Sequence, residues 1–151
     1  MSHVAAVQCE VRDLEVLKSA AEAVGLEFRE GQRTYKWFGK WVNDWHGPRA
    51  AVTKGYDPTT FGTCDHVLAV KGSTVGSQYE IGVTANDDGT YGLVYDTWGG
   101  GGQTLERLAG TDLVGLRNEV AAETASRFAR RHGYRVQRTT EGQTIRMVLK
   151  Q

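Results

Sequence analysis

The sequence lacks a surplus of charge of either sign, because 18 aspartates and glutamates balance its 18 lysines and arginines. A protein that binds nucleic acid in general carries a basic excess, which displaces the counterions of the phosphates. The balance therefore argues against general nucleic-acid binding and leaves open only a local basic patch.

Long apolar runs are also missing. No stretch of the sequence approaches the ~20 apolar residues that are needed to cross a bilayer. The segment MSHVAAVQCEVRD, at the N-terminus, lacks the basic segment and the apolar block of a signal peptide. We therefore expect a cytoplasmic protein with no signal peptide and no membrane contact.

Cysteines are few, and common catalytic motifs are absent. Cys9 and Cys64 stand in strand-like runs without CxxC spacing, which predicts reduced and buried thiols. There is no GxSxG motif, and no histidines have the HxH or HExxH spacing of a metal site. The triplet Cys64-Asp65-His66 lies in a strand pattern, which sends adjacent side chains to opposite faces and predicts packing. We expect no catalytic residue, no metal and no cofactor.

What is present indicates a single α+β domain over residues 1–151. Alternating apolar residues predict strands over 3–11 and 26–28. Between them, a helix begins after Asp13, an N-cap residue type, and ends at Gly25. Three further strands are predicted over 65–72 and 78–96, and the turn NDDG joins the last two.

The rest of the chain predicts a long helix and a closing hairpin. The helix, over 103–133, has an apolar stripe from Leu105 to Phe128, which Gly110 and Gly115 would bend or break. The hairpin, over 134–150, would turn one apolar face to the core: Tyr134, Val136, Ile145, Met147 and Leu149. The expected order is β-α-β-(loop)-β-β-β-α-β-β, with a largely antiparallel sheet covered by two main helices.

Residues 32–63 interleave aromatic and basic side chains, and we expect irregular or short-strand structure there. Aromatic faces stack on planar rings, and arginine or lysine contacts phosphates. The alternative is a small tryptophan-rich core under a long loop, because exposed tryptophans are costly. The candidate ligand-binding residues of this segment are Arg33, Tyr35, Lys36, Trp37, Lys40, Trp41, Arg49 and Lys54.

Four consecutive glycines follow a predicted strand and lead into the predicted helix. Free backbone amides and the positive end of a helix dipole suit an anion at such a place. Because no GK[ST] is present, the run is not a P-loop. A sharp turn from strand to helix is the alternative explanation. The candidate phosphate-binding residues are Trp98, Gly99, Gly100, Gly101, Gly102, Gln103 and Thr104.

Several blocks resemble the DUF1257 family, also called Ycf35-like: the MSH start, RDLEVLKSAAEAVGLEF, YEIGV…DDGTYGLVYDTWG, HGYRV and EGQTIRMVLK. The likeness covers nearly the whole chain, and the YEIG…YDTWG block is its most specific part. Members occur in cyanobacteria, plastids and phages, some beside AAA ATPase genes. The resemblance implies the fold more than the function. This chain departs from the family in its tryptophan-rich segment and in the length of its glycine run.

These patterns predict a non-enzymatic binding protein for a small anionic, nucleotide-like ligand. The phage members of the family suggest a specific version, a counter-defence protein that sequesters a nucleotide immune signal in the host cytoplasm. The alternatives are a protein interaction module, such as an adaptor of an AAA ATPase, and an enzyme acting on nucleotides. Exposed sheet edges and the tryptophans also predict a homodimer or higher homo-oligomer, with Trp37, Trp41 or Trp45 near the interface.

Overall fold

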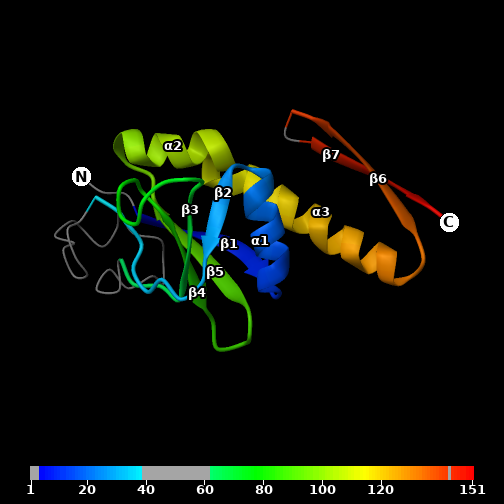
Figure 1. The fold of residues 1–151 in the computed structure, drawn as a ribbon, viewed down its shortest axis with the longest axis horizontal. Helices are drawn as coiled ribbons and strands as arrows, with labels where there is room; N and C mark the ends of the chain where they lie inside the picture. The colour runs from blue at the N-terminus through cyan, green and yellow to red at the C-terminus, as the bar shows by residue number, and fades with distance from the viewer. Residues whose placement is uncertain (1–3, 39–61, 143) are drawn as a thin grey trace.

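The computed structural model describes residues 4–38, 62–142 and 144–151, without the side chains of residues 8–10. It confirms the predicted α+β class and order of elements (Figure 1). In chain order these elements are β1 (Val4–Val11), α1 (Leu14–Ala23), β2 (Leu26–Arg29), β3 (His66–Val70), β4 (Ile81–Ala85), β5 (Tyr91–Asp96), α2 (Gly99–Ala109), the 3-10 turn η3 (Thr111–Leu113), α3 (Val114–Arg131), β6 (Arg135–Glu141) and β7 (Thr144–Lys150).

The main sheet has five strands in the order β1-β5-β4-β3-β2, and each neighbouring pair is antiparallel. The predicted hairpin is confirmed, since β4 and β5 pair Val83 with Leu93 and are joined by a turn over residues 86–89. Gly89 has a φ of 83° in this turn, a left-handed conformation that glycine adopts readily. The sheet ends at β1 on one side and at β2 on the other.

α1 begins and ends where its sequence predicts. The Asp13 carboxylate accepts a hydrogen bond from the Glu15 amide at 2.9 Å, and Gly25 follows the last turn with a φ of 83°. The larger apolar cluster lies between α1, the three-part helical segment α2-η3-α3 and one face of the sheet. Its fully buried side chains include Leu17, Leu26, Leu68, Ile81, Leu93, Leu105 and Leu116.

Residues 32–38 contribute to the packing on the other face of the sheet. Thr34 forms an isolated bridge with Thr63, and the Gly62 carbonyl oxygen accepts the Tyr35 amide at 3.0 Å. Gly82 makes room for the Tyr35 ring, because a Cβ at Gly82 would lie 2.6 Å from a ring carbon. A second apolar cluster results on this face: Val4, Tyr35, Trp37, Cys64, Val67, Ala69 and Val94.

The predicted helix over 103–133 needs correction in its extent. It begins at Gly99 and divides into α2 and α3, because three residues between them leave the right-handed helical region. Gly110 has a φ of 86°, Asp112 of 54° and Leu113 of 57°. Gly115 does not break α3. Its missing side chain instead lets the end of α2 approach, since a Cβ there would lie 2.9 Å from the Ala109 carbonyl oxygen.

The buried face predicted for the C-terminal part is also corrected. Phe128 is 63% exposed and Leu149 is 50% exposed, because β6 and β7 form a separate two-stranded sheet away from the main core. Figure 1 shows α3 running out beyond the five-stranded sheet, with the β6–β7 hairpin along it. Val136, Ile145 and Met147 are only half-buried. In the described ranges, no helix combines the length and the apolar character that crossing a membrane requires.

Candidate functional site

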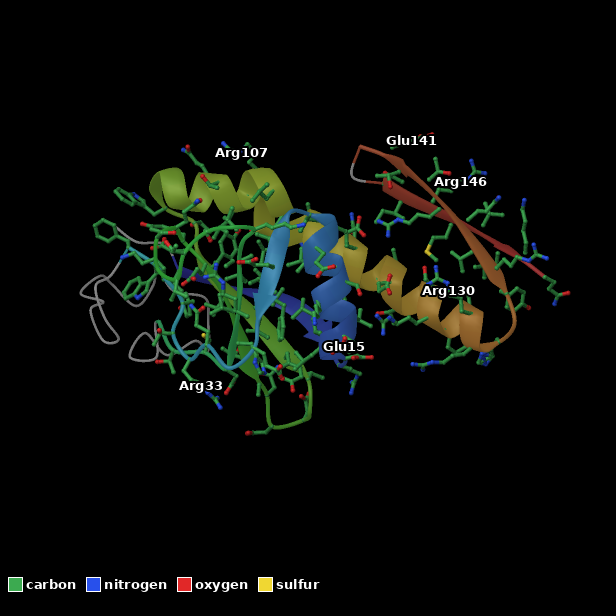
Figure 2. The ribbon with its side chains drawn as sticks, viewed as in Figure 1. Glu15, Arg33, Arg107, Arg130, Glu141 and Arg146 are labelled. Atoms are coloured by element: carbon green, nitrogen blue, oxygen red, sulfur yellow. The ribbon has the colours of Figure 1, made fainter. Side chains whose placement is uncertain are left out.

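The aromatic and basic residues predicted to bind a ligand lie in different environments. Tyr35 and Trp37 are 3% and 2% exposed and belong to the second apolar cluster, as the packing alternative requires. Arg33 is exposed at the surface (Figure 2) and forms an ion pair with Asp65 at 2.7 Å. Lys36 is half-buried. The other four candidates lie outside the described residues: Lys40, Trp41, Arg49 and Lys54.

A buried carboxylate fastens this segment to the sheet. Glu80 is 2% exposed and accepts the Lys36 amide at 2.8 Å. The Gln32 side chain donates to both Glu80 carboxylate oxygens, at 3.1 and 3.2 Å, and Arg29 donates at 3.2 Å. A buried carboxylate needs such donors to offset its lost hydration. Glu80 therefore holds residues 32–36 in place and is itself occupied by protein donors.

A second buried carboxylate positions two exposed aromatic rings. Asp96 is fully buried and accepts the backbone amides of Phe38 at 3.0 Å and Trp98 at 2.9 Å. The two rings, 51% and 38% exposed, meet edge to face with centroids 4.9 Å apart. We call Phe38 and Trp98 the aromatic corner. It offers a fixed apolar surface, and one of its residues was among the sequence candidates.

The four glycines form the first turn of α2, so the predicted strand-to-helix context is confirmed. Gly99 has a φ of 69°. A Cβ at Gly101 would lie 2.4 Å from the Tyr79 ring, and one at Gly102 would lie 2.3 Å from the Thr97 backbone. Only Gly100 has open space and no positive φ. Close packing and turning thus account for three of the four glycines.

The amide end of α2 is a less favourable anion site than the sequence suggests. Trp98, the N-cap residue, has no side-chain cap, which leaves amides of the first turn without a capping side chain. However, Asp96 places a carboxylate at this positive end of the helix, which weakens its attraction for a second anion. Thr104 Oγ1 donates to the Gly100 carbonyl at 2.9 Å, and Gln103 is exposed.

The structure adds a groove that sequence reasoning missed. It has a volume of about 410 Å³ and lies between the β1–α1 junction and the C-terminal half of α3. Its titratable lining consists of three arginines and one aspartate. We call it the arginine groove, and its lining residues are Val11, Arg12, Asp13, Val16, Val120, Thr124, Arg127, Phe128 and Arg131.

The arginine groove combines an apolar floor with cationic walls. Val11, Val16 and Val120 are at most 7% exposed and form the floor. Arg127 donates to Glu123 at 2.9 Å, and this hydrogen bond raises the pKa of the guanidinium. The exposed Phe128 ring stacks on His132 with centroids 4.3 Å apart. Such a site can hold a molecule that has both an anionic group and an apolar or planar part.

The signal for this groove in the sequence was the spacing of Arg127 and Arg131. Four residues apart on a helix, the two side chains share one face. The apolar stripe of the helix instead predicts a core position for Phe128, which lies between them. Arg12 lies at the other end of the chain, and no local pattern connects it to α3. Only the packing of α1 on α3 brings these residues together.

The triplet Cys64-Asp65-His66 is not arranged for catalysis. Burial raises the pKa of the Cys64 thiol to about 12, and the thiol donates to the Gln32 carbonyl. His66 Nδ1 instead accepts the Gly31 amide at 2.9 Å. Nucleophilic cysteines need a lowered pKa and an adjacent base. Among the described residues, no cluster of three potential metal ligands is present.

Comparisons with family models, curated proteins and solved structures find no match to this chain. The resemblance to the DUF1257 family therefore stays a prediction from the sequence.

Proposed function

We propose that this protein binds a small anionic, nucleotide-like ligand without a chemical step, and that the arginine groove is its binding site. The observation that carries the proposal is that three arginine side chains, an apolar floor and an exposed aromatic ring line one concave site. This location differs from the tryptophan and glycine segments to which the sequence pointed.

The dimensions and chemistry of the groove support a ligand of this class. Its volume of about 410 Å³ falls within the range of about 300–1,000 Å³ that is usual for small-molecule sites. Arginine binds phosphate or carboxylate through two parallel hydrogen bonds. The face of Phe128 that is not stacked on His132 offers a stacking surface for a planar base, and the valine floor would exclude water beneath the ligand. Exclusion of water strengthens each contact between a guanidinium and an anion.

Asp13 and Glu123 restrict what the groove accepts. Glu123 already partly neutralises Arg127, and Asp13 adds a negative charge to the lining. The anionic group would therefore be held mainly by Arg131, whose guanidinium enters no ion pair within the described residues. In the specific version suggested by the family resemblance, the ligand is a nucleotide immune signal that a phage protein sequesters.

Isothermal titration calorimetry tests the proposal with a panel of ordinary nucleotides, cyclic nucleotides and cyclic ADP-ribose isomers. We expect one class of these to bind, and Arg131→Ala to weaken binding by roughly 10- to 100-fold, as for loss of a charge-assisted hydrogen bond. Arg107→Ala, an exposed arginine on α2, is the matched control and should leave affinity unchanged.

Three outcomes would count against this assignment. If no member of the panel releases or absorbs heat, the protein does not bind this class of ligand. If Trp98→Ala abolishes binding and Arg131→Ala does not, the site is the aromatic corner. If the ligand is recovered chemically changed after incubation, the protein is an enzyme.

The aromatic corner favours a second candidate function, a protein interaction module. Exposed, rigidly positioned aromatic rings are frequent anchors of protein interfaces, and Asp96 holds both Phe38 and Trp98. A pull-down that recovers an AAA ATPase with the wild-type chain and not with Trp98→Ala would support this function. Trp37 is unsuitable for this test, because it is buried and its removal would disturb the core.

A further inference from the structure

The zero net charge of the chain hides a strong separation of charge. Residues 127–151 hold seven lysines and arginines against one acidic residue, a net charge of +6. The preceding 126 residues hold eleven against seventeen, a net charge of −6. The positive segment consists of the last turn of α3 and the β6–β7 hairpin. Arg127 and Arg138 of this segment pair with Glu123 and Glu119 of α3, and the remaining cations make the hairpin the more positive part of the molecule.

The register of the hairpin sorts its side chains onto two faces. Val136, Ile145 and Met147 are half-buried toward α3, and Arg138 on the same face forms an ion pair with Glu119 of α3. Arg146 lies on the opposite face, which points away from α3 (Figure 2). This outward face is built from four exposed cross-strand pairs: Arg135 with Lys150, Gln137 with Val148, Thr139 with Arg146, and Glu141 with Thr144.

The outward face carries cations that are available to a partner. Within the described part of the chain, Arg135, Arg146 and Lys150 form no ion pair. Glu141 is the single acidic residue of the face. Exposed arginines and lysines without carboxylate partners attract phosphates and release counterions when they bind them.

The shape of the hairpin fits a groove of duplex DNA. Two strands lie about 4.8 Å apart, so a ribbon with its side chains is roughly 10 Å wide, and the major groove of B-DNA is about 12 Å wide. Each strand has seven residues, and at about 3.3 Å per residue it spans about two thirds of a helical turn of ~34 Å. Gln137, Thr139 and Thr144 add side-chain hydrogen-bonding groups along the same face.

We propose that the outward face of the β6–β7 hairpin binds duplex DNA, with the ribbon in the major groove and its cations on the flanking phosphates. The acidic remainder of the chain would be repelled by the DNA and so orient the hairpin toward it. A protein partner fits this face less well. Protein interfaces are built around apolar and aromatic anchors, and this face has one apolar side chain, Val148. This inference is independent of the ligand proposed for the arginine groove.

Fluorescence anisotropy with a labelled duplex of about 20 base pairs at ~50 mM salt tests the inference with two triple variants of equal net charge. The first replaces Arg135, Arg146 and Lys150 by alanine, and the second replaces Lys18, Lys71 and Arg107, which are exposed elsewhere. We expect the first to lose at least tenfold in affinity, with a salt slope reduced by about 2–3 because each phosphate contact contributes about 0.9. The second should stay within about twofold of the wild type.

A gain-of-function variant tests DNA binding even if one of the triple variants fails to fold. Glu141→Lys replaces the only acidic residue of the outward face and should strengthen duplex binding severalfold. Circular dichroism should show unchanged secondary structure for all variants, since these side chains are exposed.

Equal losses in the two triple variants would overturn the inference, as would equal affinity for single-stranded and duplex DNA. Absence of duplex binding at low salt would also overturn it. If light scattering then showed salt-sensitive dimers of the wild type that the first triple variant lacks, the face would be an interface between copies of this chain.

Discussion

An alanine scan of the glycine run would separate the four positions that look equivalent in the sequence. Each of Gly99, Gly100, Gly101 and Gly102 is replaced singly by alanine. The structure gives each position a different environment, so the four variants should differ in stability in a defined order. If all four glycines served ligand contact alone, the variants would show no such order.

The magnitudes follow from the space around each Cβ and from the backbone. Gly100→Ala should raise the free energy of unfolding by about 0.5–1 kcal/mol, because the added Cβ meets open space and alanine lowers the conformational entropy of the unfolded chain. Gly99→Ala should cost about 1–2 kcal/mol, because φ is 69°. Gly101→Ala should cost about 1–2 kcal/mol, since the half-buried Tyr79 ring can move aside. Gly102→Ala should cost about 3 kcal/mol or more, because its Cβ meets the Thr97 backbone.

Urea unfolding of the four variants, followed by circular dichroism, measures the free energy of unfolding from the midpoint and slope. Unchanged slopes would show that the variants share one unfolding transition. Equal destabilisation at Gly100 and Gly102 would refute the reasoning, because it would mean that the turn between β5 and α2 is not packed as described.

Two further predictions concern α3 and the buried cysteine. Phe128→Ala should change the free energy of unfolding by less than about 1 kcal/mol, whereas Leu116→Ala on the same helix should cost about 2–5 kcal/mol in a urea titration; equal costs would place Phe128 in the core. In a Cys9→Ser background, native Cys64 should resist iodoacetamide at pH 8. Burial raises the pKa of the folded thiol to about 12 from 9.0. The contribution of the protonated thiol to stability should therefore be complete below pH 9 and be lost between pH 9 and 12. If the difference in free energy of unfolding from Cys64→Ala did not change with pH, this prediction would be wrong.

Local sequence patterns correctly predicted the elements whose structure depends on interactions between residues close together in the chain. Asp13 and Gly25 define both ends of α1 because a side-chain cap and a left-handed residue act within a few residues. The hairpin between β4 and β5 was predictable because apolar alternation and the NDDG turn agree. Alternation also identified the strands of the five-stranded sheet, although it did not show that both faces are covered.

The predictions from the sequence were wrong where the packing of distant elements determines the structure. The stripe that ends at Phe128 has correct helical spacing, yet α3 extends past the sheet that would cover it. The division between α2 and α3 depends on Asp112 and Leu113. Aspartate adopts a positive φ only occasionally and leucine rarely, so neither residue predicts the break. Val136 and Met147 alternate as core residues do, but they pack on one helix and not between two layers.

The candidate site was predictable only in part. Trp98 and the glycine turn were placed correctly at the start of a helix, and the burial of Tyr35 and Trp37 matches the alternative considered from the sequence. The arginine groove joins Arg12 to residues of α3 through packing, which no single-sequence pattern reports. Net charge likewise averages over the chain and conceals where the cations lie.

The hydrogen bond between Tyr35 and Gly62 has a consequence for how this fold can vary. This bond holds together two points of the chain that are far apart in the sequence, beside the second apolar cluster. The entropy cost of joining two such points grows only slowly with the number of residues between them. We therefore expect the pairing of residues 34–35 with residues 62–63 to tolerate changes in the length of the chain that connects them.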